Sequence, residues 1–249
     1  MAEALRAAVL EKVPHGFMTR RGGVSDGLVE GLNCGFGADD DPASVSENRR
    51  RASEAVLPHA ALVTAYQIHS PDVVTVDSPW ADDARPRADA LVTARTGLLL
   101  GIITADCAPV LLADREGGII GAAHAGWRGA HGGVIEATVL AMERLGARRD
   151  RIAAAVGPCI AQASYEVSDD FRALFSGADG RFFAAGTPGH WQFDLPGYVA
   201  ARLEESHVGA IEVLPHDTYA DPARFYSFRR ATHRNEPTYG RQLSLIGLA

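Results

Sequence analysis

The stretch that most constrains this chain covers residues 104–129, TADCAPVLLADREGGIIGAAHAGWRG. Three short apolar runs, 98–104, 110–113 and 118–123, end in Asp or Gly turns, which predicts three buried strands. Cys107 follows the first of these strands and His124 follows the third. Loops that are held by a rigid sheet are favoured places for chemistry, so both residues are candidate site residues.

The composition is that of an ordinary folded protein. The chain has 249 residues, of which 47% are hydrophobic and 22% charged, and we expect one core and a single domain over residues 1–249. The formal net charge of -7 argues against a nucleic-acid-binding surface. We therefore expect small-molecule partners rather than nucleic acid.

The cysteines and the hydropathy pattern predict a cytoplasmic protein. Cys34, Cys107 and Cys159 are odd in number, widely spaced and without a CxxC motif, so a disulfide framework is not expected. The N-terminal segment carries acidic residues and lacks the apolar run of a signal peptide. The longest apolar stretch, 97–105, has the length of a strand, so no membrane span is expected.

The rest of the chain mixes strand and helix patterns, which predicts an α/β fold. Strands are expected at 15–21, 62–68, 72–76, 152–156 and 211–214. Helices are expected at 42–57, 131–145, 168–175 and 195–206, where apolar residues recur at helical spacing or follow capping residues. The arginines of the first helix are expected on its solvated face.

Three potential metal ligands come from three separate loops: His69, Cys107 and His124. A Cys-His-His set leaves a fourth tetrahedral position open, which is typical of catalytic rather than structural zinc. The alternative is that Cys107 is a small buried residue and that the histidines are hydrogen-bonded loop residues. Spacing alone does not separate these two interpretations.

Other polar residues in glycine-rich or aromatic loops are candidates for catalysis and substrate binding. Asp106, beside Cys107, could orient an imidazole or take a proton, or it could cap a turn. Guanidinium groups suit phosphate oxygens, although surface solvation is the alternative for each arginine. The candidate substrate-binding residues are Arg20, Arg21, Asn33, Arg128, Arg229 and Arg230.

Six segments of this chain resemble one known family. They are HGFMTRRGGVSDG, QIHS, TADCAPVLLAD, GAAHAGWRG, GPCIAQASYEV and YSFRR. Together they resemble the bacterial laccase-domain proteins, also called the multicopper polyphenol oxidase family and, more recently, a family of zinc-dependent purine nucleoside phosphorylases and adenosine deaminases. The resemblance runs nearly end to end.

The resemblance implies a fold and a metal site. The fold is a layered α/β/β/α sandwich, similar to the catalytic domain of cytotoxic necrotizing factors. The metal is held by the histidine of QIH, the cysteine of ADC and the histidine of HAGWRG, here His69, Cys107 and His124. One departure is that Asp217 stands where family members often carry a cysteine.

Four functions are compatible with these observations. The resemblance implies a zinc enzyme that phosphorolyses adenosine, inosine, guanosine and methylthioadenosine and deaminates adenosine. A copper-dependent polyphenol oxidase is less favoured, because the nine histidines form no H-x-H pair. A Cys-His hydrolase or amidase would use Cys107 as nucleophile and His124 as base. A non-enzymatic binding protein is the least favoured alternative.

Overall fold

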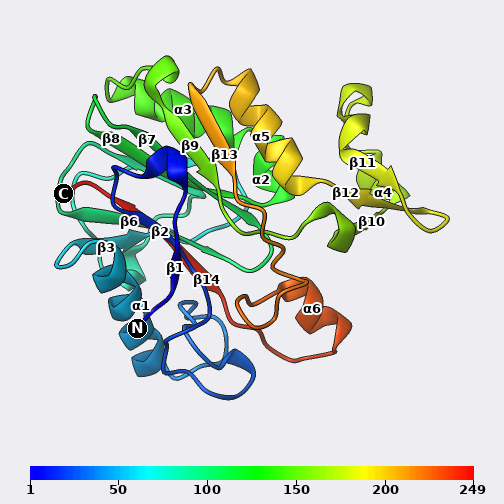
Figure 1. The fold of residues 1–249 in the computed structure, drawn as a ribbon, viewed down its shortest axis with the longest axis horizontal. Helices are drawn as coiled ribbons and strands as arrows, with labels where there is room; N and C mark the ends of the chain where they lie inside the picture. Colours follow the sequence, from blue (N-terminus) through cyan, green and yellow to red (C-terminus); the bar gives the residue numbers. More distant parts are fainter.

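The structure, a computed structural model that describes residues 1–249, contains two large sheets, one small sheet and helices on the outer faces (Figure 1). The strands are β1 (Ala4–Leu5), β2 (His15–Met18), β3 (Ala61–Thr64), β4 (Val73–Thr75), β5 (Ala90–Thr93), β6 (Leu98–Thr104), β7 (Ala108–Asp114), β8 (Ile119–Ala125), β9 (Ala153–Val156), β10 (Glu166–Ser168), β11 (Phe183–Ala185), β12 (His190–Phe193), β13 (Ala210–Val213) and β14 (Gln242–Gly247). The α-helices are α1 (Pro42–Val56), α2 (Trp127–Gly132), α3 (Val134–Arg144), α4 (Asp169–Arg172), α5 (Leu195–Glu205) and α6 (Phe228–His233). Short 3-10 segments lie at Ala8–Leu10, Gly27–Val29, Asp82–Ala84, Arg149–Arg151, Gln162–Ser164 and Gly177–Phe182.

The two large sheets mix parallel and antiparallel pairs. One has the strand order β1-β2-β14-β6-β3, and the other has the order β13-β9-β7-β8-β5-β4. The last strand, β14, pairs antiparallel with both β2 and β6, so the C-terminal segment lies inside the first sheet. The small sheet, β10-β12-β11, extends from the main body together with α4 (Figure 1). The predicted α/β class is confirmed.

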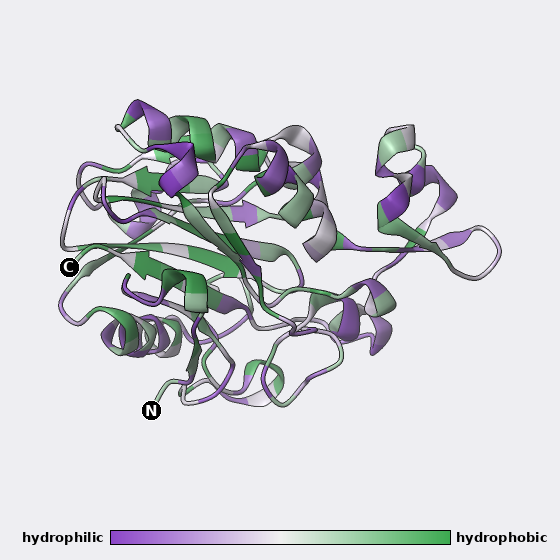
Figure 2. Ribbon diagram, turned by 45° about the horizontal axis from the view of Figure 1, so that its top comes forward, coloured by the Kyte–Doolittle hydropathy of each residue, from purple (hydrophilic) through white to green (hydrophobic).

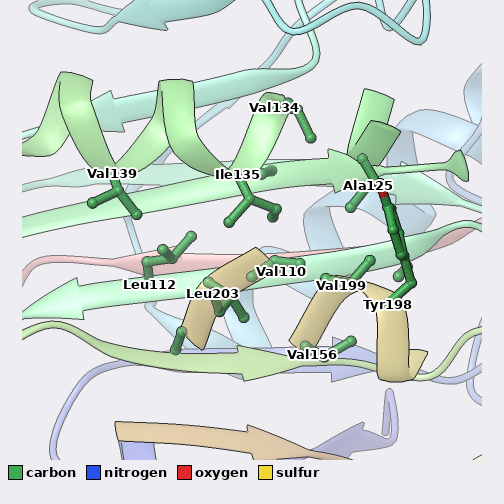
Figure 3. Close-up of a cluster of buried hydrophobic side chains, with 14 of the residues drawn as sticks. Val110, Leu112, Ala125, Val134, Ile135, Val139, Val156, Tyr198, Val199 and Leu203 are labelled. Atoms are coloured by element: carbon green, nitrogen blue, oxygen red, sulfur yellow. The ribbon is translucent and has the colours of Figure 1, made fainter. Parts of the chain in front are cut away.

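Three hydrophobic clusters show that the layers follow the order helix, sheet, sheet, helix. Successive side chains of a strand point to opposite faces, so Leu111 packs between the sheets while Leu112 packs toward α3 and α5. In β6, likewise, Leu100 packs between the sheets and Leu99 toward α1. Figure 3 shows β7 side chains meeting those of α3 and α5. Both faces of these strands are covered, which explains their continuous apolar sequences.

Hydropathy follows the same layering. Green, hydrophobic stretches run along the strands of the two sheets, whereas purple segments lie on the outer helices and loops (Figure 2). No helix of the structure has both the length and the apolar character needed to cross a bilayer. The likeness to the cytotoxic necrotizing factor domain stays a prediction.

Helix α1 begins where the sequence predicts it, but one of its arginines is not solvated. The Asp41 side chain accepts hydrogen bonds from the amides of Ala43 and Ser44, and Pro42 occupies the first turn. Arg49 is only 6% exposed and its guanidinium contacts Asp82 at 2.9 Å. The prediction that all arginines of this helix face solvent is therefore wrong for Arg49, because its buried guanidinium forms an ion pair with Asp82, a residue distant in sequence.

Several predicted elements are shorter than their sequence patterns. The strand expected at 62–68 ends at Thr64, because Tyr66 then pairs with Arg87 and Gln67 bonds the Ile103 backbone through its side chain rather than its main chain. The helix expected at 168–175 is the single turn α4, whose N-cap Ser168 accepts a hydrogen bond from the Phe171 amide. The helix expected at 131–145 begins at Val134, since residues before it form the separate helix α2.

Candidate metal centre

The structure brings the three predicted metal ligands together at the seam between the two large sheets. His69 follows β3, Cys107 lies in the turn between β6 and β7, and His124 lies near the end of β8. Their ligand atoms all lie within 4.8 Å of one another, and the Cys107 Sγ is 3.8 Å from the His69 Nε2. The two imidazole ring centroids are 4.7 Å apart. No other group of this kind occurs in the structure.

A buried carboxylate that the sequence analysis missed, Asp89, positions two of these residues, the His124 ring through its Nδ1 and His69 through its backbone amide. Its Oδ1 lies 2.8 Å from the His124 Nδ1 and accepts the His69 amide at 2.9 Å. Its Oδ2 accepts the amides of Ile68 and Ser70 and the Ser70 hydroxyl. In the sequence Asp89 is a lone acidic residue directly before the short apolar run that forms β5. Because we did not predict β5 as a strand, we did not recognise Asp89 as a residue at a strand end.

Because Asp89 holds the Nδ1 of His124, the Nε2 of that ring is free to face Cys107. A carboxylate behind a histidine is the usual arrangement for a metal-binding imidazole, since it sets the tautomer and the ring orientation. The hydrogen bond from His124 opposes the effect of burial and lowers the pKa of Asp89 to about 2. Asp89 therefore stays ionised at neutral pH.

The thiol of Cys107 is activated by the two histidines. Burial by itself would raise the pKa of this thiol, but the neighbouring His124 and His69 lower it to about 6. Burial likewise disfavours the charged form of His124, yet the Cys107 thiolate and the Asp89 carboxylate raise its pKa above the ordinary value. In the absence of a metal the site therefore favours a thiolate beside a protonated imidazole.

The backbone around the centre is strained and closely packed. His69 and Asp106 have positive φ angles of 61° and 81°, which cost non-glycine residues about 1–3 kcal/mol each. A Cβ atom at Gly126 would lie 2.8 Å from the Cys107 Sγ and 2.9 Å from the His69 ring. The first glycine of HAGWRG is thus needed because the chain between β8 and α2 passes directly over the group.

The donor set and its spacing fit a tetrahedral transition-metal ion. Metal–ligand bond lengths of about 2.0–2.3 Å place neighbouring ligand atoms of such an ion about 3.3–3.6 Å apart. The observed distance of 3.8 Å between the Cys107 Sγ and the His69 Nε2 is close to this spacing. Small side-chain rotations would bring the two atoms to the ligand–ligand distance of a bound ion. One thiolate and two imidazoles suit zinc, and also suit copper.

Asp106 does not contact either imidazole. Its carboxylate is buried and accepts hydrogen bonds from the hydroxyls of Thr218 and Ser227 and from the Arg229 amide. Burial raises the pKa of this carboxyl group. Asp106 thus ties the Cys107 turn to the segment that leads into α6, and the orienting role that we considered for it is taken by Asp89.

The structure places the predicted arginines in three different environments. Arg128 and Arg229 line the cavity above the centre, and Arg229 donates to the Glu166 carbonyl at 2.8 Å. Arg230 is 9% exposed and donates to the carbonyls of Thr218, Tyr219 and Phe225, so it braces a loop.

Arg20 and Arg21 lie outside this cavity, beside a separate shallow hollow. Arg20 donates to the carbonyls of Glu30 and Pro222, and Arg21 donates to that of Ala223. Their placement does not support the substrate-binding role that we predicted for them.

The cavity has a volume of about 780 Å³ and is lined by aromatic and cationic side chains that spacing alone did not reveal. The lining residues that the sequence analysis missed include Phe36, Tyr66, Arg85, Trp127, Phe171 and Arg241. Asn33 is fully buried and does not line the cavity; its side chain instead binds the Gly35 and Arg241 amides beside it.

Asp217, the residue that departs from the family pattern, has a structural environment. It accepts hydrogen bonds from the Ser164 hydroxyl at 2.6 Å and from the amides of Ala161 and Tyr219. Through these bonds it joins the segment after β9 to the segment after β13. The carboxylate does not line the cavity.

Comparison with known proteins extends over nearly the whole chain. A purine nucleoside phosphorylase of Deinococcus radiodurans is 45% identical over 241 residues, covering 95% of this chain and 89% of the relative. A purine nucleoside phosphorylase of Streptomyces griseus is 40% identical, covering 93% of both chains.

Solved structures agree with this relationship. A Neisseria meningitidis protein superposes with a TM-score of 0.88 at 32% identity and covers 99% of this chain and 98% of its own. YlmD from Geobacillus stearothermophilus superposes with a TM-score of 0.87 at 30% identity, covering 97% and 94%. The family model described as multi-copper polyphenol oxidoreductase laccase matches residues 14–249. This chain belongs to that family.

Proposed function

We propose that this chain is a purine nucleoside phosphorylase whose reaction takes place over the His69, Cys107 and His124 group. The observation that carries the proposal is that this group lies in a cavity of about 780 Å³ that also presents aromatic rings and arginines. A purine base needs an apolar face to stack on, and phosphate needs cationic donors. Relatives at 40% and 45% identity that are named purine nucleoside phosphorylases support the same reaction.

The residues of the chain have separable roles in this proposal. Zinc is the proposed ion, and when bound it would supply Lewis acidity at the floor of the cavity. Asp89 holds the tautomer of His124 and, through the backbone amide, the position of His69. Trp127, Tyr165 and Phe171 exclude water from the reacting bond.

Adenosine, inosine, guanosine and methylthioadenosine are the proposed substrates, and deamination of adenosine is a proposed second activity. Both would occur in the same cavity. Phosphorolysis requires inorganic phosphate, whereas deamination requires only water, so the two activities can be separated by leaving phosphate out.

A single chromatographic assay tests the proposal. Zinc-loaded protein with adenosine and phosphate should release adenine and ribose 1-phosphate in proportion to phosphate, while inosine should form without phosphate. Cys107→Ser, His69→Ala and His124→Ala should lose bound zinc and both products. Arg20→Ala, outside the cavity, is the matched control and should keep both. Zinc-loaded protein that leaves all four nucleosides unchanged over a range of phosphate and pH would refute the proposal.

One observation favours a second candidate, a Cys-His hydrolase. The Cys107 thiol has a pKa of about 6 and lies beside a His124 that Asp89 orients, which is the arrangement of a nucleophile, its base and an orienting carboxylate. A bound zinc ion would coordinate the Cys107 thiolate, which would then not be free to act as the nucleophile of the hydrolase. If zinc-free protein cleaves amide or ester substrates and added zinc inhibits it, the hydrolase is favoured over the phosphorylase.

A further inference from the structure

One wall of the cavity is formed by Phe36, Arg85 and Arg241. We refer to it as the Phe36 wall, and to the wall formed by Trp127, Arg128, Tyr165, Glu166, Phe171 and Arg229 as the Tyr165 wall. Phe36 and Arg241 come from segments that flank the five-stranded sheet, and Arg85, from the connection between β4 and β5 of the six-stranded sheet, lies over the Phe36 ring. Trp127 and Tyr165 follow other strands of the six-stranded sheet, β8 and β9. The metal-ligand group is drawn from both sheets, so we place it between the two walls.

The Phe36 wall presents several hydrogen-bond donors without a protein acceptor. Arg241 donates through Nη2 to the Tyr239 hydroxyl, and Arg85 donates through Nε to the Asp82 carbonyl. The Nη1 of Arg241 and both terminal nitrogens of Arg85 have no hydrogen-bonded acceptor in the protein. The backbone amides of Phe36 and Gly37 also lack one.

The glycine loop and Arg241 are held in place before any ligand arrives. The Asn33 Oδ1 accepts both the Gly35 amide at 3.1 Å and the Arg241 amide at 3.0 Å. A Cβ atom at Gly35 would lie 2.9 Å from the Arg241 Cδ, so the glycine loop and the arginine are in direct contact. Little side-chain entropy is therefore lost when an anion binds.

The distribution of carboxylates distinguishes the two walls. Glu166 lines the Tyr165 wall, where its negative charge would repel phosphate but could accept the N–H groups of a purine. The other carboxylate that lines the cavity, Asp106, lies beside Cys107 and accepts its hydrogen bonds from Thr218, Ser227 and Arg229. No carboxylate lines the cavity at the Phe36 wall; the nearest, Asp82, lies 3.8 Å from the Arg85 Nε and pairs with Arg49. This cationic wall lies within a chain of net charge -7, so the positive charge is concentrated locally.

We propose that the Phe36 wall binds inorganic phosphate and that the Tyr165 wall binds the purine base, an assignment that rests on the proposed phosphorylase function. Displacement at C1′ requires the nucleophile to approach opposite the departing base, so this assignment places the two ligands on separate walls of the cavity. An oxygen of hydrogen phosphate forms the new C1′–O bond while the C1′–N9 bond breaks. The electron pair goes to N9, and the proton of hydrogen phosphate ends on the released base.

The first test separates the Michaelis constants for phosphate and nucleoside. Arg85→Gln and Arg241→Gln should each raise the phosphate KM at least about tenfold, because each removes charge-assisted hydrogen bonds, and should leave the nucleoside KM nearly unchanged. Arg241→Lys, which keeps the charge, should restore part of the loss. The control is Arg87→Gln, because Arg87 stacks on Tyr66 but does not line the cavity.

A second variant tests the subsite without removing charge. A methyl group at Gly37 would meet only the Arg241 guanidinium, at 3.4 Å from Nη1, and Gly37 does not need a positive φ. Gly37→Ala should therefore weaken phosphate binding while the protein folds normally. If Arg128→Gln or Arg229→Gln raises the phosphate KM and these three variants do not, the assignment of the walls is reversed and the proposal fails.

Calorimetric titration of the zinc-loaded protein with inorganic phosphate separates this inference from the proposed function. If the wild type binds phosphate and Arg241→Gln does not, the subsite is supported even when the wild-type protein releases no base. The absence of base release would refute only the phosphorylase function. Phosphate binding that is absent from the wild type, or unchanged in Arg85→Gln, Arg241→Gln and Gly37→Ala, would overturn the subsite.

Discussion

Replacing Asp89 by asparagine should weaken both metal binding and folding, and a matched control variant separates the two effects. The carboxylate is fully buried and accepts five hydrogen bonds, from the His124 ring, the Ser70 hydroxyl and three consecutive backbone amides. Asparagine has the same shape but only one acceptor oxygen, and its amide group is a donor. In either orientation, an NH₂ group therefore faces groups that also donate.

The two orientations have different consequences. If the amide nitrogen takes the place of Oδ2, it faces the amides of Ile68 and Ser70 and the loop that carries His69 is displaced. If it takes the place of Oδ1, it faces the His69 amide, whose hydrogen bond is lost, and the His124 Nδ1, which loses its charged acceptor and must become an acceptor itself. The His124 proton then moves to Nε2, the nitrogen that a metal would need.

The magnitude follows from the bonds that are lost. At least two hydrogen bonds to a charged group disappear, at about 1.5–3 kcal/mol each, so the free energy of unfolding of the metal-free protein should fall by about 3–6 kcal/mol. Removing a carboxylate behind a metal-binding histidine lowers metal affinity about 10–100-fold. Zinc affinity is measured by competition with a chelator, and stability by urea unfolding of the metal-free protein.

Asp114→Asn is the matched control. Asp114 is also fully buried and accepts from the amides of Gly117 and Arg148 and from the Arg151 guanidinium, but it does not line the cavity. It should lose comparable stability while zinc affinity stays within about twofold of the wild type. If Asp89→Asn also kept wild-type zinc affinity, or if Asp114→Asn lost as much affinity, the reasoning about His124 would be refuted.

Two further predictions concern the thiol and the core. In metal-free protein the ultraviolet absorbance of the Cys107 thiolate should appear with a midpoint near pH 6. In His124→Ala the midpoint should rise, because the imidazole that lowers the thiol pKa against the effect of burial is then missing. A wild-type midpoint at the ordinary thiol value would contradict this. Gly157→Ala should lower the free energy of unfolding by about 1–3 kcal/mol or more, because the added Cβ would lie 2.1 Å from the Phe17 ring. The control is Gly177→Ala, where an added Cβ would have no atom within 4 Å, and it should change the midpoint of urea unfolding little.

Much of the central fold could be predicted from local patterns. The apolar runs of β6, β7 and β8 are continuous because each strand is covered on both faces, and such runs remain visible without a partner. Helices α1 and α5 begin at Asp-Pro and Asp-Leu-Pro signals that depend only on nearby backbone amides. Cys107 follows β6 as these patterns predicted, but His69 lies five residues beyond the end of β3 rather than at a strand end, and His124 lies within β8 rather than after it.

Other elements depended on pairing between distant segments. Strand β14 has an ordinary sequence, QLSLIG, and becomes a central strand only because β2 and β6 pair with its two edges. The small strands β10 and β12 pair with each other across more than twenty residues, so the capped pattern after Ser168 indicated a longer helix than the single turn that forms. Short segments of this kind are ambiguous until their partners are known.

The partners of buried charges were decided only by the tertiary structure. Asp89 and Asp106 both precede apolar residues, yet one binds His124 and the other binds Thr218 and Ser227. Arg49, expected on a solvated helix face, and Arg230, a candidate for substrate binding, are both buried, because groups distant in sequence accept their hydrogen bonds. Propensity acts over a few residues, whereas a buried charge needs partners that only the folded chain brings within hydrogen-bonding distance.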